Sequence, residues 1–417
     1  MLFTRLVSIL AAVSFVLAAD WPNGPFVNDG RWIVDASNNS VIYAGVNWPG
    51  AAETMLPEGL QYQSIEFIVA KIKAMGMNVI RLTYATQMID EIYDNGGEGI
   101  PIATALVSAL GQENGTSIFQ RILANNPTFS ENITHLEVFD AIASECAKNE
   151  IYVHLDNHVS KAMWCCAYND GNGFFHDTHF DVGNWTRGLS YMANHGLSWP
   201  NLMSMSLRNE LRPTLDSLVA TTLYYNWGTW YTNVKLGADA INAANPKVLI
   251  FLSGLLSDTY LTPAVDEAWL LPSFSTFNKH DFAAPNKLVW ELHNYDLISA
   301  EAVTCSELQT ILHLAGFSTL TSDNEKTALP MVMTEWGFDQ DDTTYEGVYA
   351  TCLVDYLPAQ QVGWMIWVIG GSHYIREGTQ DSDETYGMLN HEWSDWRSPV
   401  FIEEALIPMV NKSLSNA

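Results

Sequence analysis

The sequence predicts an α/β fold: a (β/α)8 TIM barrel, in which eight parallel strands alternate with helices. Two observations support this prediction. Eight short apolar or β-branched segments recur along the chain, with amphipathic stretches between them. No GxGxxG or GxxxxGK[ST] motif follows an early strand, which argues against the nucleotide-binding open-sheet folds.

The predicted strands are short runs bounded by polar residues or by glycine and proline. In chain order they are Val41–Val46, Asn78–Leu82, Ile151–Asp156, Leu202–Ser206, Val248–Leu252, Leu288–His293, Met331–Thr334 and Val362–Trp367. Apolar residues at helical spacing predict helices between the strands, among them Ile65–Met75, His135–Lys148 and Trp230–Ala244. Two long loops are expected, Ala85–Glu131 after the second strand and Ile369–Arg397 after the eighth. Both should emerge at the carboxyl-terminal face, where barrel enzymes build their sites.

The N-terminal residues have the pattern of a secretory signal peptide. Arg5 precedes a short apolar run that ends in small residues, so residues 1–18 are expected to be removed, with cleavage after Ala18 or Ala19. An uncleaved anchor is the alternative, but the apolar run is short for a membrane span. Residues 19–417 contain no repeat and no linker, which indicates a single domain. The signal peptide predicts that this domain is secreted and extracellular.

A secreted protein can carry N-linked glycans and form disulfides, so the sequons and the cysteines are relevant. Asn38, Asn114, Asn132, Asn184 and Asn411 begin Asn-X-Ser/Thr motifs that can carry glycans in a eukaryotic host. The five cysteines predict one or two disulfides and one leftover thiol. Cys305 with Cys352 is one plausible pair, and Cys146 with Cys165 or Cys166 is another, although spacing alone does not fix connectivity.

The charge of the chain restricts its partners. A formal net charge of −28 and a pI near 4.5 argue against nucleic acid and anionic membranes, which require basic patches. The adjacent cysteines lack the second CxxC or histidine spacing of a zinc site, so no metal and no other cofactor is expected. We expect a monomer acting on a neutral substrate.

Polar side chains stand at or just beyond the ends of the predicted strands. Burying such a group without a partner costs several kcal/mol, so a ring of them around one barrel mouth indicates a functional site. The ring consists of Arg81, His158, Asn209, Glu210, His293, Tyr295, Glu335 and Trp367. His154, Asp156 and Glu291 share the alternation of this set and are interpreted as a supporting network inside the barrel.

Two of these residues, Glu210 and Glu335, follow the fourth and seventh strands, which face each other across an eight-stranded barrel. Cleavage of a glycosidic bond requires one protonated carboxyl group and one ionised carboxylate. A retaining pair lies about 5–5.5 Å apart. In a retaining pair we expect the pKa of the acid/base to be high beside the ionised nucleophile, and lower once that charge is consumed in a covalent intermediate.

The motifs around these residues resemble glycoside hydrolase family 5 of clan A, the cellulase family. They are SLRNE (Ser206–Glu210), ELHNY (Glu291–Tyr295), TEWG (Thr334–Gly337) and the strand end at Trp367. The segment DNHVSKAMWCCAYNDGNGFF resembles the cellulase-like branch of plants and fungi. The resemblance covers nearly all of the chain beyond the signal peptide, and it is specific for the family rather than for the substrate.

The resemblance implies a role for each residue of the ring. Glu210 is implied to be the acid/base and Glu335 the nucleophile of a retaining β-glycoside hydrolase. Asn209 would bind the sugar 2-hydroxyl, and Trp367 would form a platform under the sugar at the −1 subsite. The implied substrate-binding set is Arg81, His158, Asn209, His293, Tyr295 and Trp367. Within this set, Arg81 and Tyr295 would orient Glu335.

Other functions remain to be weighed. The substrate implied by the resemblance is a β-linked polysaccharide or oligosaccharide of the cellulose or mannan type. An exo-acting β-glycosidase or a glycolipid glycosidase on the same fold is an alternative, as is an inactive sugar-binding barrel. A metal-dependent amidohydrolase requires an HxH motif at the first strand, where this chain has Gly45-Val46-Asn47-Trp48.

Overall fold

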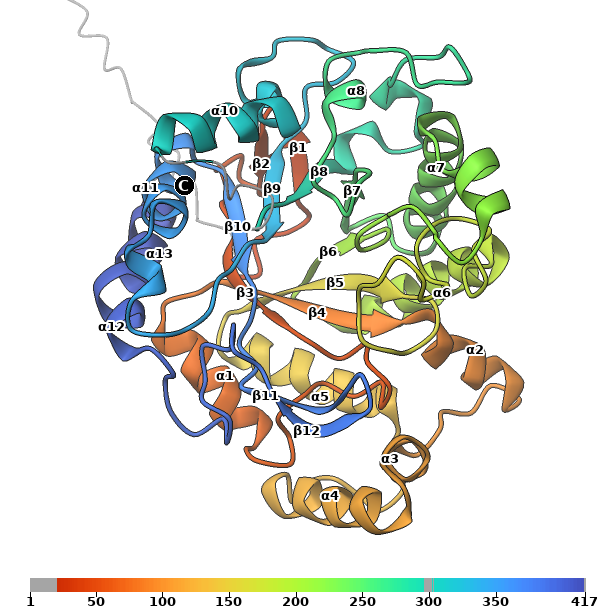
Figure 1. Cartoon of the computed structure of the whole chain (residues 1–417), viewed down its shortest axis with the longest axis vertical. Coiled ribbons are helices and arrows are strands. Elements are labelled where there is room, and N and C mark those ends of the chain that lie inside the picture. The colour runs from red at the N-terminus through yellow and green to blue at the C-terminus, as the bar shows by residue number, and fades with distance from the viewer. Residues whose placement is uncertain (1–20, 296–301, 303, 416–417) are drawn as a thin grey trace, which may run out of the picture.

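The computed structural model describes residues 21–295, 302 and 304–415. Eight parallel strands close into a barrel in chain order, and the last of them pairs with the first (Figure 1). They are β3 (Ala44–Trp48), β4 (Val79–Ala85), β5 (Tyr152–Val159), β6 (Leu202–Ser206), β7 (Leu249–Ser253), β8 (Leu288–His293), β9 (Met331–Glu335) and β10 (Gly363–Ile366). The predicted TIM barrel is confirmed, and β6 and β8 have the predicted bounds.

Helices surround the barrel strands and bury one apolar face against them (Figure 1). The longer ones between strands are α1 (Ile65–Ala74), α5 (His135–Lys148), α6 (Val182–His195), α7 (Trp227–Ala244), α10 (Cys305–Ala315) and α11 (Val348–Gln360). Short helices α8 (Thr262–Val265) and α12 (Pro399–Phe401) and the C-terminal helix α13 (Ile407–Leu414) complete this layer. The start of α5 shows how the sequence sets a helix end, because Thr134 and Glu137 form a reciprocal capping box.

The segment Ala85–Glu131, expected as a long loop, is mostly helical. It folds into α2 (Thr86–Asp94), α3 (Ile102–Leu110) and α4 (Gln112–Asn125). Apolar side chains three or four residues apart, such as Ile102 with Leu106 and Ile118 with Ile122, are buried along these helices. This helical spacing is the physical reason that the loop prediction was wrong.

The segment after β10 contains a two-stranded antiparallel hairpin, β11 (Ser372–Arg376) and β12 (Thr379–Asp383). Arg376 at the end of β11 and Glu384 just after β12 line the cavity at the carboxyl ends of the barrel strands. The second long loop therefore contributes to the predicted face of the barrel.

The barrel interior is layered from apolar to polar. At its amino-terminal end, side chains including Val79, Phe251 and Val289 pack with Phe26 and Ile33. The latter two belong to or precede the hairpin of β1 (Val27–Asp29) and β2 (Trp32–Val34). Two residues further along β4, β7 and β8 the buried side chains are polar, namely Arg81, Ser253 and Glu291, as expected for alternation with a period of two.

The cysteines and the predicted signal peptide lie outside the barrel strands. The disulfide Cys305–Cys352 and one free cysteine agree with the prediction, but the free cysteine is the buried Cys146. Its proposed pairing with Cys165 or Cys166 is wrong, because those two residues are bonded to each other. The signal peptide predicted at residues 1–18 lies outside the described residues. None of the helices in the described ranges is long and apolar enough to cross a membrane.

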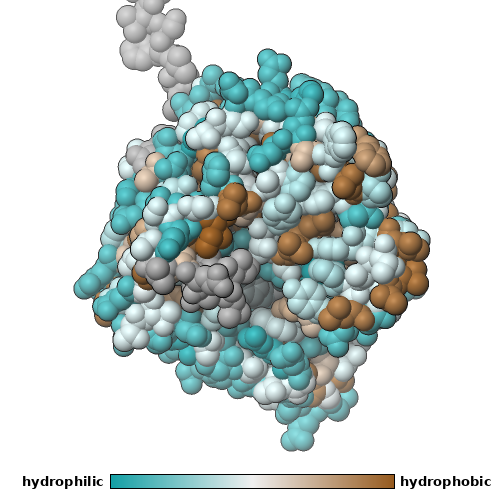
Figure 2. Space-filling model, turned by 45° about the horizontal axis from the view of Figure 1, so that its top comes forward, coloured by the Kyte–Doolittle hydropathy of each residue, from teal (hydrophilic) through white to brown (hydrophobic). Residues whose placement is uncertain are grey.

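The surface is consistent with the composition of the chain. Hydrophilic residues dominate the face seen in Figure 2, and apolar residues form separate patches among them. The sequon asparagines Asn38, Asn114, Asn132 and Asn411 are exposed, and Asn184 is half-buried with its amide donating to Asp90. The monomeric state remains a prediction.

Candidate active site

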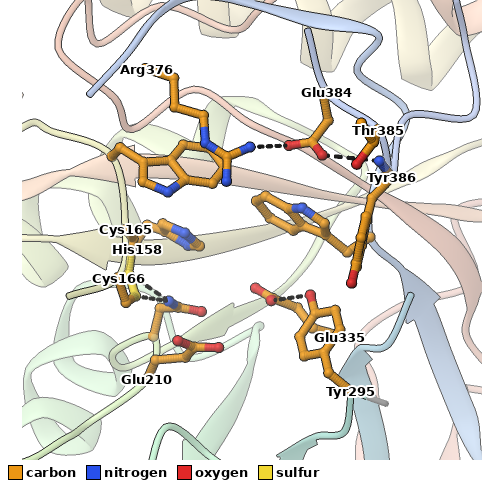
Figure 3. A pocket seen from close by; sticks show the side chains of 13 residues that line it. His158, Cys165, Cys166, Glu210, Tyr295, Glu335, Arg376, Glu384, Thr385 and Tyr386 are labelled. Carbon is orange, nitrogen blue, oxygen red and sulfur yellow. Dashed lines mark hydrogen bonds and ion pairs between the residues drawn. A yellow bond between two sulfur atoms is a disulfide. The ribbon is translucent and has the colours of Figure 1, made fainter. Parts of the chain in front are cut away.

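A cavity of about 440 Å³ opens at the carboxyl ends of the barrel strands (Figure 3). Six of the predicted site residues line it, together with residues of the β5–α6 loop and of the segment after β10. The lining consists of His158, Trp164, Cys165, Cys166, Asn209, Glu210, Tyr295, Glu335, Trp367, Arg376, Glu384, Thr385 and Tyr386. The structure therefore gathers residues that are far apart in the sequence around one cavity.

Glu210 and Glu335 face each other across this cavity (Figure 3). Glu335 is the last residue of β9, and Glu210 lies four residues beyond the end of β6. One carboxylate oxygen of each and a ring nitrogen of His293 all lie within 4.8 Å of one another. The two carboxyl groups are therefore close enough to act on the two ends of one bond.

The backbone of Glu210 is held in an uncommon conformation. Its φ of +48° lies in the left-handed region, which costs a residue with a side chain about 1–3 kcal/mol. The backbone N–H of Glu210 donates to Oδ2 of the buried Asp258 at 2.7 Å. Burial raises the pKa of Asp258 well above its ordinary value, and the nearby charge of His293 opposes this shift without cancelling it.

Glu335 is oriented by two donors. The guanidinium of Arg81 donates to Oε1 through Nη1, and the Tyr295 hydroxyl donates to Oε2 at 2.8 Å. Burial alone would lower the pKa of Arg81, but the neighbouring carboxylates of Asp156, Glu335 and Glu291 raise it above its ordinary value. Arg81 is therefore a permanent cation beside the Glu335 carboxylate.

Asn209 is fixed by the same guanidinium. Nη2 of Arg81 donates to Oδ1 of Asn209 at 2.8 Å. Because a guanidinium only donates, this contact distinguishes the amide oxygen of Asn209 from its nitrogen. The amide nitrogen Nδ2 then faces the Cys165–Cys166 pair, at 3.5 Å and 3.7 Å from the two sulfur atoms. Because Asn209 lines the cavity, its amide is available to a substrate hydroxyl.

His293 connects the two glutamates to a polar network below them. Its Nδ1 lies 3.2 Å from Oε1 of Glu210 and 3.6 Å from Oε2 of Glu335. Its Nε2 lies 3.0 Å from Oγ1 of Thr334, which donates to Oε1 of Glu291 at 2.7 Å. Since the Thr334 hydrogen is directed to Glu291, Nε2 of His293 is the donor in its contact with Thr334.

The pKa values of His293 and Glu210 are shifted in opposite directions, and the shift of Glu210 differs from the predicted one. Burial alone would lower the pKa of His293, but Glu335, Glu210 and Glu291 raise it well above its ordinary value. Burial likewise raises the pKa of Glu210, but the hydrogen bond and charge of His293, together with the charge of Arg212, make the pKa lower than usual. The predicted high pKa of Glu210 is therefore wrong for the unliganded site, because cationic His293 compensates for the charge of Glu335.

His158 and Trp367 form one wall of the cavity. Their rings are stacked with centroids 5.8 Å apart and planes within 9°. Nδ1 of His158 lies 2.6 Å from Oδ2 of Asp156, which sets the orientation of the ring. A side chain at Gly337 would come within 2.4 Å of the Trp367 carbonyl oxygen, so this glycine permits the segment after β9 to approach Trp367.

Arg81 and His293 lie in different positions from the rest of the predicted substrate-binding set. Both are buried, and neither lines the cavity. Arg81 contacts Glu335, and His293 contacts both Glu210 and Glu335. Asp156 and Glu291 belong to the network below the site, as interpreted from the sequence. His154 lies deeper, between Ser204 and Ser206 at 2.7 Å from each hydroxyl oxygen.

Sequence reasoning missed several residues that shape the site. Asp258 lies five residues beyond β7, where the sequence analysis assigned no polar strand-end residue. Arg376 stacks on Trp164 with its guanidinium 3.8 Å from the ring centroid, and it pairs with Glu384 at 3.2 Å. The aromatic and charged residues of the segment after β10 indicate that it forms part of the cavity wall. They do not indicate that Arg376 contacts Trp164 and Glu384.

Two groups of side chains come within the spacing of a metal site in the described ranges. In the first, the sulfur atoms of Cys165 and Cys166 accompany Glu210, but both sulfurs are in a disulfide and are not thiolate ligands. The second combines Glu210, His293 and Glu335, whose donor atoms are already paired with one another or with Arg81. Neither group has the donor chemistry of a ready metal site.

Comparisons with known proteins agree with this geometry. The model of the cellulase family, glycosyl hydrolase family 5, matches residues 34–373. A glycosyl hydrolase 5 family protein from Chamaecyparis obtusa is 34% identical over 411 residues, which are 96% of this chain and 68% of that protein. An endoglucanase from Paenibacillus polymyxa is 19% identical, over 90% of this chain and 85% of its own.

Solved structures share the fold. The catalytic domain of the major endoglucanase from Xanthomonas campestris pv. campestris superimposes with a TM-score of 0.66 at 17% identity, covering 94% of this chain and 99% of that one. An endocellulase from Pyrococcus horikoshii, solved as a complex with cellotetraose, gives 0.66 at 18% identity, covering 92% and 98%. On the family match and the similarity to the Chamaecyparis protein, this chain belongs to glycosyl hydrolase family 5, the cellulase family, and is a glycosidase that hydrolyses O-glycosyl bonds.

Proposed function

We propose that this protein is a secreted, retaining β-glycoside hydrolase that cleaves a β-linked glucan or mannan by double displacement, with Glu335 as nucleophile and Glu210 as acid/base. The observation that carries the proposal is the spacing of the two carboxyl groups, with an oxygen of each within 4.8 Å. Inverting enzymes need about 6.5–9.5 Å to admit a water between the carboxyl groups and the sugar. The spacing therefore favours retention.

In the first step, Oε2 or Oε1 of Glu335 attacks the anomeric carbon while Glu210 gives a proton to the departing glycosidic oxygen. Arg81 and Tyr295 hold Glu335 in place for the attack. The proton delivered by Glu210 comes from the hydrogen-bonded pair that it forms with His293. A bound sugar would displace water from this pair and move the proton to Glu210, where the leaving oxygen takes it.

In the second step, Glu210 removes a proton from a water that attacks the glycosyl ester of Glu335. The ester has no charge, so His293 and Glu210 no longer face an anion at Glu335. Asn209 would donate to the sugar 2-hydroxyl throughout, and this contact strengthens in the oxocarbenium-like transition state. Trp367, which lines the cavity, would lie under the sugar ring.

The proposed substrate class is supported by the relatives. The proteins to which this chain is similar include endoglucanases, and one of them was solved with cellotetraose. Trp164, Tyr295, Trp367 and Tyr386 line the cavity and offer flat apolar surfaces that sugar rings stack on. The proposed extracellular location suits a polymeric substrate that does not enter cells.

An exo-acting β-glycosidase is a second candidate, favoured by one feature of the cavity. Arg376 connects Trp164 to Glu384 by a cation–π contact and an ion pair, and all three residues line the cavity. Such a bridge would limit how many sugar units extend past it. An endo-acting enzyme would instead bind the chain across the cavity.

Product lengths distinguish these two functions. The purified protein would be incubated with cellulose, mannan, β-1,3/1,6-glucan and aryl β-glycosides, and the products separated by chromatography at early times. We expect oligosaccharides of mixed length from one of the glucans or mannans. Release of monosaccharide alone would support the exo-acting enzyme, and no hydrolysis of any β-linked substrate would contradict the proposed function.

A further inference from the structure

The disulfide between the adjacent residues Cys165 and Cys166 forms part of the catalytic cavity wall. It lies in the loop between β5 and α6, and both residues are half-buried. In Figure 3 the pair stands on the same side of the cavity as His158 and Glu210. A disulfide in this position borders the cavity, and Cys165 also packs against the hydrophobic core.

This disulfide contributes little to stability through loop closure. It joins neighbours in the sequence, whereas Cys305–Cys352 closes a loop with a separation of 47 residues. The entropy that a disulfide removes from the unfolded chain grows with the size of that loop. The location of Cys165–Cys166 therefore calls for a function other than stabilising the fold.

Its contacts are with two residues of the proposed reaction. The amide Nδ2 of Asn209 lies 3.5 Å from the Cys165 sulfur and 3.7 Å from the Cys166 sulfur. Both sulfur atoms and a carboxylate oxygen of Glu210 lie within 4.8 Å of one another. The other end of the Asn209 amide is bound by Arg81, so the sulfur atoms and the guanidinium hold it from two sides.

The chemistry of a disulfide suits this position. Its sulfur atoms have no hydrogen to donate and are weak acceptors, so they do not compete strongly for the amide hydrogens of Asn209. They cover the amide nitrogen on one side, and the Asn209 side chain also lines the cavity. Two thiols or two hydroxyl groups would add rotatable donors and acceptors at the same place.

Building on the proposed function, we propose that the Cys165–Cys166 disulfide is a positioning element of the −1 subsite. It fixes the Asn209 amide so that one N–H meets the sugar 2-hydroxyl, and it packs against the same edge of the sugar. In its oxidised form the loop thereby holds Asn209 for the hydrogen bond that strengthens in the transition state. The part of the substrate that the disulfide contacts is the C2 edge of a β-glycoside.

The test compares two disulfide variants, C165S/C166S and, as the matched control, C305S/C352S. For each protein, kcat and KM would be measured on the aryl β-glycoside that the native enzyme cleaves fastest and on its 2-deoxy counterpart. The ratio of the two kcat/KM values measures the benefit of the 2-hydroxyl and cancels the intrinsic reactivity of the substrates. We expect the ratio to fall about tenfold in C165S/C166S, mainly through kcat, and to stay at the native value in C305S/C352S.

The folding of C165S/C166S would be checked by circular dichroism. If it does not fold, the same ratio would be measured on C305S/C352S before and after treatment with a water-soluble phosphine. The phosphine takes an oxygen atom from water and leaves two thiols at Cys165 and Cys166, which mass spectrometry counts. An unchanged ratio in an active enzyme overturns the inference alone, whereas a native enzyme inactive on every β-glycoside overturns the proposed function and the inference with it.

Discussion

Oε1 of Glu210 lies 3.2 Å from Nδ1 of His293, and the opposite ring nitrogen of that histidine is bound to Thr334. The Thr334–Glu291 contact makes Nε2 a donor, which leaves Nδ1 as the place where a proton can be shared with Glu210. The acid/base of the proposed reaction is therefore a pair of residues with one proton between them, and its titration belongs to the pair.

The first prediction concerns the pH dependence of this pair. The pKa of His293 is raised well above 6.5, so the shared proton is present below that raised pKa and is lost as the pH rises through it. In His293→Ala the proton must reside on Glu210 alone, whose ordinary pKa of 4.5 is raised by burial but starts below the 6.5 of a histidine. The basic limb of kcat/KM should move to lower pH by about one unit or more.

The measurement is a pH–rate profile on an aryl β-glycoside. His195→Asn is the matched control, because His195 on α6 pairs with Asp140 far from the cavity lining. Its profile should coincide with that of the native enzyme. A His293→Ala profile with an unmoved basic limb would rule out the shared proton.

A second prediction concerns Asp258, which accepts the backbone N–H of Glu210. Asp258→Asn keeps an acceptor oxygen for this N–H in a side chain of the same shape, so we expect kcat/KM within about threefold of native. Asp258→Ala leaves this N–H unpaired where the backbone has a φ of +48°, and should lower kcat/KM about 10–100-fold, or about 1.4–2.7 kcal/mol. Steady-state kinetics on both variants check this, and equal losses in the two would contradict the positioning role.

A third prediction separates stability from catalysis. Replacing Cys305 and Cys352 by serine removes the link between α10 and α11 and should lower the free energy of unfolding by about 2–4 kcal/mol. Neither residue lines the cavity, so kcat/KM at 25 °C should stay near the native value. Urea denaturation followed by circular dichroism gives the first quantity. A large loss of activity without a loss of stability would contradict the prediction that this disulfide stabilises the fold and has no role in catalysis.

A fourth prediction concerns the two glutamates themselves. Glu210→Gln and Glu335→Gln keep the shape of the side chains, so the circular dichroism spectrum should not change. Activity on a glycoside with a poor leaving group should fall by about four orders of magnitude or more in each. On a glycoside with an activated leaving group, which needs no proton, Glu210→Gln should retain more activity in the first step than Glu335→Gln. Equal losses on both substrates would argue against the assigned roles.

Much of the fold could be predicted from the sequence because strands buried on both faces appear as short apolar runs. The bounds of β6 and β8 agree with the prediction, and Glu210 and Glu335 line one cavity as expected. Arg81 lies inside β4 rather than at its end, and it contacts Glu335 without lining the cavity. The helices within Ala85–Glu131 were not predicted, although apolar residues of this segment recur at helical spacing. The length of the segment alone does not distinguish a loop from a set of short helices.

Other features could not be predicted from a single chain without coordinates. The pairing of Cys165 with Cys166 was not anticipated because spacing does not determine connectivity. The low pKa of Glu210 depends on His293, which is 83 residues away in the sequence and 3.2 Å away in space. Electrostatic partners of this kind follow from the closure of the barrel and not from any local motif.

The stereochemistry of the first product tests the central proposal most directly. An aryl β-glycoside would be hydrolysed in D2O inside an NMR tube, and the anomeric proton signals of the released sugar followed before mutarotation. The opposed carboxyl groups of Glu210 and Glu335 predict that the β-anomer appears first and the α-anomer only later. Initial appearance of the α-anomer would contradict the double displacement.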